Sequence, residues 1–314
     1  DLHSFPTRRS SDLHIGFQEL GTVGRGESTE IGTFIEKSVD HELSANIIDL
    51  CPVGALNNKP YRYRARAWEM TQHPLISPHD SVGTNIYAHV LRGRVMRVVP
   101  RPNEAVNETW IADRDRFSFQ GVYSEDRLMK PMLRENGVWQ ETDWETALGW
   151  VAERLGRVAK QHGGAQIGAL ASPNATLEEH YLLAKLARGL GSSNLDHRLR
   201  RTDFRDEASD PLYPTLGCAI AELETASAVL VVGSNLRKDV PLIAHRIRKA
   251  AIGNGTKVSF ANPHRYEYLF PVAAHLTSNG LDMFGHLLAI AAAAANARSE
   301  EHTSELQSPI LISY

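Results

Sequence analysis

The sequence lacks most of the features that would assign a function at once. Its 314 residues contain only two cysteines, Cys51 and Cys218, which lie far apart. Two distant cysteines exclude a disulfide framework and fit a reducing compartment. No run of about eighteen apolar residues occurs, so the sequence predicts no membrane-spanning helix. The net charge of −3 gives no field that would favour nucleic acid or an anionic membrane.

Common catalytic and nucleotide-binding motifs are missing as well. The 14 histidines are scattered, with no H-E-x-x-H motif, so none of them predicts a metal ligand. There is no G-x-G-x-x-G and no P-loop lysine motif. We therefore assign no catalytic residue. Hydrophobic residues make up 42% and charged residues 23%, which is an ordinary globular composition in a chain long enough for two domains.

One stretch of the sequence is distinctive, Leu43–Tyr61, with Cys51-Pro52 near its centre. A cysteine followed at once by proline closes the ligand run of bacterial-type iron–sulfur proteins. A short helix around 42–50 is expected to lead into Cys51. Pro52, with its fixed φ and missing N–H, suits the first turn of a second short helix over 53–56. Taken alone, however, a single cysteine in an apolar stretch is more often a buried small hydrophobe.

The longer pattern around Cys51 resembles the family of the G subunit of NADH-quinone oxidoreductases, the large iron–sulfur subunit of respiratory complex I. The resemblance is carried, in order, by residues 21–26, 32–37, 42–44, 46–56 and 59–61. It implies that Cys51 is the last of four thiolates on a [4Fe–4S] cluster. Since the only other cysteine is Cys218, the chain retains one ligand of this cluster and lacks three.

The resemblance also predicts five segments and an α/β fold class. Residues 1–13 and 298 to about 308 are polar and aperiodic, and the tails 1–13 and 298–314 look like translated sequencing-adapter sequence. Residues 1–13 and 299–314 are expected to pack on nothing. Residues 14–62 resemble a truncated [4Fe–4S] ferredoxin-like module. Residues 63–127 resemble the small β-rich domain of molybdopterin oxidoreductases, and residues 128–297 resemble part of their parallel-sheet α/β domain. We therefore expect an internal slice of a longer protein.

In the small β-rich segment, the runs 85–91 and 94–99 flank Arg92-Gly93 and predict a hairpin. The resemblance implies that superfamily members which bind a cluster in this domain carry cysteines at four aligned positions. These positions are occupied here by Ser77, Asp80, Thr84 and Ala112. None of the four is a thiolate, so this extra cluster is expected to be absent.

Two helices are predicted after residue 128 by capping-box spacing, at Thr142–Glu145 and at Thr176–Glu179. The first helix should keep one apolar face from Trp144 to Val158 and end at Gly163. The second should run through Leu190. A short strand is expected between them, over 167–171.

The next part of the sequence predicts a parallel sheet. An apolar run at Ala228–Val232 reads as a buried strand, followed by a helix at about 240–251 and a second strand at 257–261. This strand–helix–strand order requires a crossover connection. A last helix is expected over 281–296.

The remaining candidate sites are weaker. Gly233-Ser234-Asn235 follows the buried strand, where an open α/β sheet can bind a pterin or a nucleotide phosphate, but the structural role is favoured because no phosphate motif is present. Cys218 lies in an apolar setting and is expected in the core. The arginines at 198, 200 and 201 fit a solvated face better than a site for acidic partners.

The functional hypothesis follows from the resemblance. It implies relay of electrons through iron–sulfur clusters from NADH to quinone, with other peripheral-arm subunits of complex I as partners. The expected location is the cytoplasmic side of the bacterial inner membrane, without nucleic acid, membrane insertion or bound molybdopterin. The alternatives are a molybdopterin-dependent oxidoreductase of the formate dehydrogenase type and a cofactor-free structural module.

Overall fold

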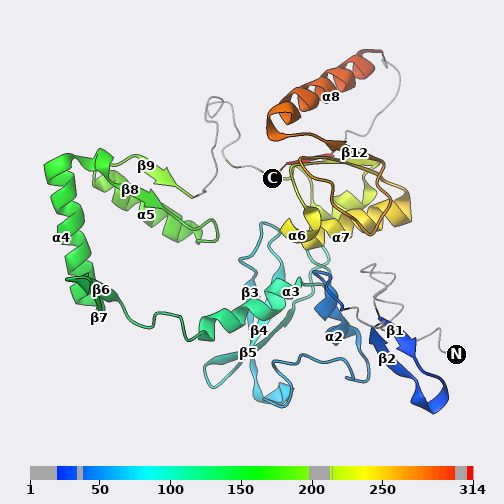
Figure 1. Ribbon diagram of the computed structural model, residues 1–314, viewed down its shortest axis with the longest axis horizontal. Coiled ribbons are helices and arrows are strands. Elements are labelled where there is room, and N and C mark those ends of the chain that lie inside the picture. The colour runs from blue at the N-terminus through cyan, green and yellow to red at the C-terminus, as the bar shows by residue number, and fades with distance from the viewer. Residues whose placement is uncertain (1–19, 34–37, 198–212, 214, 301–309, 314) are drawn as a thin grey trace. The chain divides into compact units, whose positions relative to one another are not determined.

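The computed structural model describes residues 20–33, 38–197, 213, 215–300 and 310–313. Spatial contacts divide the chain into a larger unit, Asp1–Phe119 with Thr215–Tyr314, and a smaller unit, Gln120–Pro214 (Figure 1). These units are defined by contacts, whereas the five predicted segments were defined by resemblance, so the segment boundaries stay predictions. The arginines at 198, 200 and 201 lie outside the described residues.

The larger unit begins with a hairpin of β1 (Leu20–Val23) and β2 (Glu30–Thr33), which pair antiparallel. The sequence analysis predicted no strand here. A 3₁₀ turn over Ser44–Asn46 continues into α2 (Ile47–Leu50), so the helical segment that leads into Cys51 is confirmed, although it starts two residues later than expected.

A three-stranded antiparallel sheet follows in the order β3-β4-β5, formed by Thr71–Ile76, Asn85–Leu91 and Arg94–Pro100. The β4–β5 hairpin confirms the prediction, and both turn residues, Arg92 and Gly93, have positive φ (50° and 76°), as a two-residue hairpin turn of type I′ requires. Strand β3 was not predicted. It contains a proline, which an edge strand tolerates. Helix α3 (Asp113–Phe117) packs against β5.

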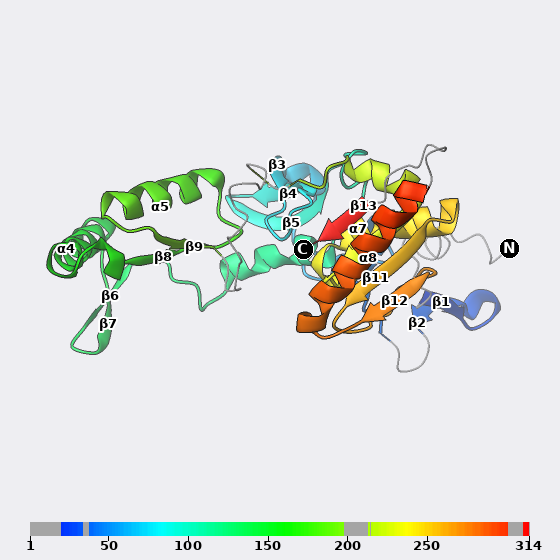
Figure 2. The same ribbon diagram turned by 90° about the horizontal axis from the view of Figure 1, so that it is seen from above.

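The second sheet of the larger unit has the order β12-β11-β10-β13, and all its pairings are parallel. Strands β10 (Ala228–Val232) and β11 (Lys257–Asn262) confirm the predicted parallel pair. They are connected by α6 (Leu236–Asp239), α7 (Pro241–Lys249) and a π-helical turn over Ala250–Asn254. The unpredicted β12 (Ala274–Thr277) lies beside β11 (Figure 2). The predicted α/β class is confirmed.

One hydrophobic core joins the segment before Cys51 to this parallel sheet. Its buried members come from both parts: Leu43, Ile47, Val82 and Ala112 from the N-terminal part, and Leu223, Val229, Val231, Leu236, Val240, Leu242, Ile243, Ala244, Ile247, Ala251, Val258 and Phe260 from the α/β part. Full burial of a side chain of this size contributes roughly 1.5–3 kcal/mol. The position of α2, and hence of Cys51, is therefore fixed by the main core of the unit.

Ordered structure extends into the predicted C-terminal tail. Helix α8 spans Gly280–Glu300, and β13 (Ile310–Ser313) pairs parallel with β10, with Ile310 opposite Val229. The prediction that residues 299–314 pack on nothing is therefore wrong for Ile310–Ser313. The physical reason is that this apolar, β-prone run can pair with the open edge of β10. Residues 1–13 lie outside the described residues. In the part of the chain that the structure describes, no helix is both long and apolar enough to cross a membrane.

The smaller unit confirms both predicted helices. Helix α4 spans Trp144–His162 and α5 spans Leu177–Gly189. The α5 capping box forms as expected. For α4 the predicted N-cap, Thr142, is wrong. The N-cap is Asp143, whose Oδ1 accepts from the Thr146 N–H at 2.8 Å. Asp143 is the better acceptor because its side chain is a charged carboxylate.

The short strands of the smaller unit were only partly predicted. Strand β8 (Gly168–Leu170) falls in the expected segment and pairs parallel with the unpredicted β9 (Asn194–Asp196). The unpredicted hairpin of β6 (Met132–Glu135) and β7 (Val138–Glu141) turns at Asn136-Gly137.

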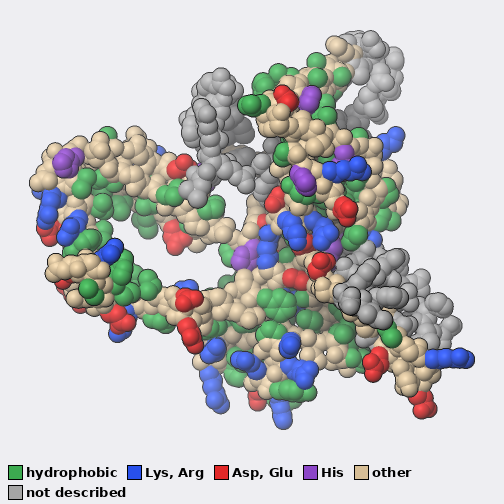
Figure 3. Space-filling model, viewed as in Figure 1, with side chains coloured by type: hydrophobic (Ala, Val, Ile, Leu, Met, Phe, Trp, Pro, Cys, Tyr) green, Lys and Arg blue, Asp and Glu red, His purple; other side chains and the backbone are tan. Residues whose placement is uncertain are grey.

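The apolar faces of α4 and α5 are largely exposed. On α4 the predicted apolar positions Trp144, Leu148 and Val151 are 70%, 60% and 42% exposed. On α5 the side chains of Tyr181 and Leu182 are also exposed. Hydrophobic side chains line the region of these helices in Figure 3. The predicted apolar stripe therefore exists, but most of it stays uncovered.

Candidate functional site

Cys51 lies where helix α2 ends and the chain turns. Its N–H donates to the Ile47 carbonyl at 3.0 Å, and its backbone is extended (φ −76°, ψ 105°). The Gly54 N–H then donates to the Cys51 carbonyl at 3.3 Å, which closes a turn with Pro52 at its second position. The predicted helix over 53–56 is thus wrong. Gly54, with φ of 67°, has left-handed backbone that favours glycine and interrupts a right-handed helix.

The loop that follows directs backbone N–H groups at the sulfur. We call residues 51–56 the Cys51 loop. The Leu56 N–H donates to Cys51 Sγ at 3.4 Å. Burial of the thiol raises its pKa, but the N–H groups of Leu56, Val53, Ala55 and Gly54 outweigh this effect, so the pKa of Cys51 is lowered. A half-buried sulfur with several N–H donors and a stabilised thiolate form is suited to bind a metal or act as a nucleophile.

The helix before the Cys51 loop is anchored by one buried amide. The Nδ2 group of Asn46, which is 1% exposed, donates to the carbonyls of Leu43 at 2.9 Å and Ile111 at 2.8 Å. In return, the Ile111 N–H donates to Asn46 Oδ1 at 3.2 Å. The buried Arg116 also forms an ion pair with Asp49 of α2. Two segments more than sixty residues apart in the sequence therefore hold Cys51 in place.

Cys218 differs from Cys51 in the direction of its pKa shift. It is partly buried and packs against the main core, as predicted. Burial raises its pKa, and the nearby Glu222 carboxylate raises it further. Within the described ranges, no group of three or more His, Cys, Asp or Glu side chains could hold a metal ion. Cys51 is thus a single candidate ligand.

Two of the four positions that the sequence analysis aligned with cluster cysteines, Ser77 and Ala112, contact one buried carboxylate. Ser77 Oγ donates to Asp115 Oδ1 at 2.7 Å, and the Ala112 N–H donates to Asp115 Oδ2 at 3.2 Å. Asp80 pairs with Arg114 at 2.6 Å. We call Ser77, Asp80, Ala112, Arg114 and Asp115 the Asp115 network.

Electrostatics of this network differ from those of the Cys51 loop. Burial raises the pKa of Asp115, the hydrogen bond from Ser77 lowers it, and the Asp80 charge raises it, so the pKa is raised overall. Thr84, the remaining position, is fully buried, and its Oγ1 has no hydrogen-bond partner in the structure. The network thus presents oxygen and nitrogen groups and no sulfur, whereas an iron–sulfur cluster is held by thiolates.

The loop after β10 satisfies its polar groups internally. Ser234 Oγ and the Asn235 N–H both donate to Asp239 Oδ2, at 2.8 and 2.9 Å. Asn262 Nδ2 donates to the Ser234 carbonyl at 2.9 Å. A carboxylate that already accepts from the loop N–H would repel an incoming phosphate, so this geometry favours the structural role of Gly233–Asn235.

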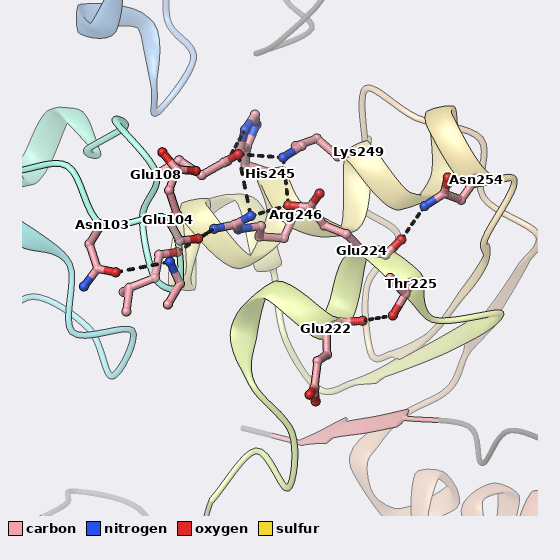
Figure 4. A network of polar contacts seen from close by, with 12 residues as sticks. Asn103, Glu104, Glu108, Glu222, Glu224, Thr225, His245, Arg246, Lys249 and Asn254 are labelled. Atoms are coloured by element: carbon pink, nitrogen blue, oxygen red, sulfur yellow. Dashed lines mark hydrogen bonds and ion pairs between the residues drawn. The ribbon is translucent and has the colours of Figure 1, made fainter.

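A partly buried ionic network, which the sequence analysis missed, connects the loop before α3 to helix α7 (Figure 4). Lys249 Nζ lies 2.6 Å from Glu108 Oε1 and 2.7 Å from Glu224 Oε1. Arg246 contacts the same two carboxylates, and His245 Nε2 lies 3.4 Å from Glu108 Oε2. These contacts, with His245 first, outweigh burial and lower the pKa of Glu108 to about 2. The sequence carries no signal for it, because Glu108 and Lys249 are more than a hundred residues apart.

A groove lies beside the Cys51 loop, with a volume of about 390 Å³. Its lining shares two residues with that loop, Ala55 and Leu56. The remaining lining residues are Leu20, Val39, Ser44, Ala45, Ile47, Ile48, Asn57, Lys59 and Arg62. It is mostly apolar, with two basic side chains, and it has no acidic side chain.

Three family profiles match this chain. The profile of molybdopterin oxidoreductases matches residues 127–308. The profile of the NADH-quinone oxidoreductase subunit 3 ferredoxin-like domain matches residues 8–57, which include Cys51. The profile of the NADH-ubiquinone oxidoreductase NDSU1/NuoG-like 4Fe-4S domain matches residues 75–120, which include the Asp115 network.

Curated relatives are similar over most of this chain. The G subunit of the NADH-quinone oxidoreductase of Rickettsia felis is 35% identical over 244 residues, which cover 78% of this chain and 35% of the relative. The NADH-ubiquinone oxidoreductase 75 kDa subunit of Reclinomonas americana is 36% identical over 267 residues, covering 79% of this chain and 37% of the relative. This chain thus spans about a third of the length of these relatives.

A solved structure, acetylene hydratase from Pelobacter acetylenicus, superposes with a TM-score of 0.43 at 16% identity. The superposition covers 62% of this chain and 28% of that structure. These values are too low to support any inference about this chain.

Proposed function

Since the chain belongs to the molybdopterin oxidoreductase family, in the branch of the large iron–sulfur subunits of NADH-quinone oxidoreductases, we propose that it relays electrons through iron–sulfur clusters. The complex would carry electrons from NADH to quinone. In this proposal, Cys51 is a ligand of a [4Fe–4S] cluster and no residue of the chain performs bond chemistry. The matches to two cluster-domain families support this function.

The observation that carries the proposal is the set of backbone N–H groups around Cys51 Sγ. They lower the pKa of the thiol, so the thiolate needed for iron binding is favoured. Neutral N–H donors to a ligand sulfur also tune the potential of a cluster. When bound, the cluster would supply one-electron transfer. The chain's own part is to hold the sulfur, direct the N–H groups and exclude water.

The residues of this chain fit one ligand position of the cluster. The donor at Cys51 has the right chemistry, but four thiolates are needed and the sequence contains only two cysteines. Cys218, whose pKa is raised, belongs to a different environment. We propose that three further thiolates come from sequence outside these 314 residues, and that the isolated chain is inactive.

A second cluster and a molybdopterin are both disfavoured. The Asp115 network presents no thiolate to iron. Asp239 accepts from the Asn235 N–H in the loop where a pterin phosphate would bind. These two observations count against the alternative of a molybdopterin-dependent oxidoreductase of the formate dehydrogenase type. The alternative of a cofactor-free structural module fits the Asp115 network but does not explain the N–H groups around Cys51.

The proposed setting follows from the relatives. They are named as subunits of NADH-quinone and NADH-ubiquinone oxidoreductases. We propose other peripheral-arm subunits as partners and the cytoplasmic side of the bacterial inner membrane as the location. No direct membrane insertion and no nucleic acid binding are part of the proposal.

The test is cluster content in a full-length large iron–sulfur subunit that carries residues 14–297 of this chain. Iron, acid-labile sulfide, molybdenum and the EPR spectrum of the reduced protein are measured. Cys51→Ala should remove one [4Fe–4S] signal, whereas the matched Cys218→Ala variant should retain it, and molybdenum should be absent. A full cluster complement in Cys51→Ala would contradict the ligand role, and stoichiometric molybdenum would favour the alternative enzyme.

A further inference from the structure

A small cavity in the larger unit lies between helix α7 and the loop that joins β11 to β12, and its volume is about 20 Å³. Its polar lining consists of His41, Arg237, His245, Arg248 and Tyr268. We propose that this cavity binds one monatomic anion of the halide class, such as chloride. The proposal is independent of the role of Cys51 and of any cluster.

The walls of the cavity are fixed by helix α7 and by an aromatic stack. Ala244 and Arg248 are four residues apart, so they lie on the same face of α7, and the small side chain of Ala244 leaves space there. On the loop side, the Tyr268 ring stacks on Phe260 of β11, with 4.2 Å between the ring centroids. The stack holds the tyrosine ring in place, so the cavity is formed before a ligand arrives.

The side chains around the cavity offer hydrogen-bond donors. Burial raises the pKa of Tyr268 to about 12, so its hydroxyl keeps its proton, and the buried Oη has no acceptor for that proton. His41 Nδ1 accepts from the Leu43 N–H at 3.2 Å, so the proton of the neutral ring is on Nε2. Arg237 and Arg248 can only donate. A bound group therefore has to act chiefly as an acceptor.

His245 is a further buried polar group at this cavity. Its side chain is 4% exposed, and its Nδ1 has no hydrogen-bond partner in the structure. Its Nε2 lies 3.4 Å from Glu108 Oε2, so Nδ1 is the ring nitrogen that remains for a ligand. A protonated ring would donate to Glu108 and to an anion at the same time. An unpaired buried polar atom costs about 1–3 kcal/mol, and a ligand in the cavity would remove that cost.

Charge favours an anion over a neutral ligand. Glu42 pairs with Arg237 at 2.7 Å and offsets its charge. Arg248, which is 9% exposed, adds a further positive charge, and burial lowers its pKa because the guanidinium has lost part of its hydration. No Asp or Glu side chain lines the cavity within the part of the chain that the structure describes. An anion beside Arg248 would gain Coulomb energy in a medium of low dielectric constant.

The volume limits the size of the anion. About 10–15 Å³ is enough for one water-sized group, so about 20 Å³ admits a single chloride or bromide but not a polyatomic oxyanion such as phosphate. A water molecule fits the same volume and can also accept from the donors. It carries no charge to offset that of Arg248, and the test has to distinguish it from a halide.

Anomalous diffraction from bromide makes this distinction. Crystals of the 314-residue chain grown in sodium bromide should show an anomalous difference peak in the cavity, within hydrogen-bond distance of Tyr268 Oη. Electron density without an anomalous signal would identify a water and overturn the proposal, as would a cavity without density.

Thermal unfolding tests binding in solution. The midpoint temperature should rise and then saturate as sodium bromide replaces sodium gluconate at constant ionic strength, because a ligand that binds only the folded chain stabilises it. Arg248→Gln should abolish this saturable rise. The matched control Arg265→Gln, which changes an exposed arginine of the same loop, should retain it. An unchanged rise in Arg248→Gln, or no saturable rise in the unsubstituted chain, would overturn the proposal.

Tyr268→Phe provides a second variant that keeps the stack on Phe260 and removes only the hydroxyl. The bromide concentration at half of the saturable rise should increase severalfold, because the anion loses one donor. This variant and the anomalous map decide the question even where Arg248→Gln does not fold. An unchanged half-saturation concentration in Tyr268→Phe would contradict the proposed site.

Discussion

Two regions of the larger unit, both matched by iron–sulfur domain profiles, provide opposite environments for a metal. In the Cys51 loop, uncharged backbone N–H groups surround a half-buried sulfur and lower its pKa. In the Asp115 network, a buried carboxylate accepts hydrogen bonds from Ser77 and Ala112, and its pKa is raised. The profile match alone therefore does not tell whether a cluster site is present.

The Asp115 network shows how polar groups are satisfied at three of the four positions that the sequence analysis aligned with cluster cysteines, Ser77, Asp80 and Ala112. Such groups need partners, because an unpaired buried polar group costs about 1–3 kcal/mol. Asp115 supplies two of these partners, and Arg114 pairs with Asp80 while also donating to the carbonyls of Lys238 and Asp239. This polar network connects Ser77 and Asp80 to helix α3, and α3 to the backbone carbonyls of α6.

The largest effect is expected when the Asn46 side-chain amide, which connects the segment before Cys51 to Ile111, is removed. Asn46→Ala should lower the free energy of unfolding by about 4 kcal/mol, because it leaves three buried backbone groups of Leu43 and Ile111 unpaired, at about 1–3 kcal/mol each. Urea unfolding measures the change. Asn57→Ala in the same region removes only exposed contacts at 3.5 Å and should cost less than about 0.5 kcal/mol. Equal midpoints for the two variants would contradict the anchoring role.

The next largest effect is a pH dependence of the free energy of unfolding that comes from His41, which lies shortly before α2 and Cys51. Burial lowers the pKa of His41 from 6.5 to about 4. The Glu42 charge raises this pKa, and the charges of Arg237 and Arg248 lower it further. Above pH 6.5 the imidazole is neutral in both folded and unfolded chains. Between pH 6.5 and 4 only the unfolded chain binds the proton, so stability falls by about 3 kcal/mol as the pH falls through this range.

The variant His41→Gln isolates this contribution. Subtracting its free energy of unfolding from that of the unsubstituted protein at each pH should give a difference that is constant above pH 6.5 and shrinks toward pH 4. Chemical denaturation at a series of pH values provides the data. A difference that does not change with pH would show that His41 titrates normally in the folded chain.

A smaller effect is expected in the Asp115 network. Asp115→Ala should lower the free energy of unfolding by about 2 kcal/mol, since the Ser77 hydroxyl and the Ala112 N–H lose their acceptor. Asp115→Asn keeps one acceptor and allows the hydroxyl to rotate and accept, so it should cost less. If the asparagine variant were the less stable of the two, the charge of Asp115 would matter more than its hydrogen bonds.

The smallest effect is expected in the alkylation rates of the two thiols of this chain, Cys51 and Cys218. Cys51 should react with iodoacetamide severalfold faster than Cys218 near neutral pH, because N–H groups lower the pKa of Cys51 while burial and Glu222 raise that of Cys218. Peptide mass spectrometry after timed alkylation measures both rates in one sample. The reverse order of reactivity would contradict the described environment of Cys51.

Local signals in the sequence predicted the elements that local chemistry determines. Arg92-Gly93 predicted the hairpin, the Thr176–Glu179 spacing predicted the start of α5, and the apolar run of β10 predicted a buried strand. The turn at Asn136-Gly137 was an equally strong hairpin signal that the sequence analysis overlooked. The pairing of β13 with β10 was missed because the polar residues before Ile310 hid a short β-prone run.

The surroundings of the candidate site could not be predicted in this way. Cys51 was found from its neighbours in the sequence, but its anchor Asn46 works through Ile111, and nothing in either local sequence indicates this pairing. The same holds for Asp115, whose partner Ser77 lies 38 residues earlier. The partners of a buried carboxylate such as Asp115 are decided by tertiary contacts, and a single sequence does not record them.

The bond between Asn46 and Ile111 also sets an order of events during synthesis. A nascent chain that has reached only Leu56 already contains the sulfur and the N–H groups around it, but the partner of Asn46, 65 residues further along, has not yet been made. Contacts of this sequence separation form late, after the cost of closing the loop between them is met. Until Ile111 has left the ribosome, α2 has no anchor, so iron would meet a rigid Cys51 only after the small β-rich domain has been translated.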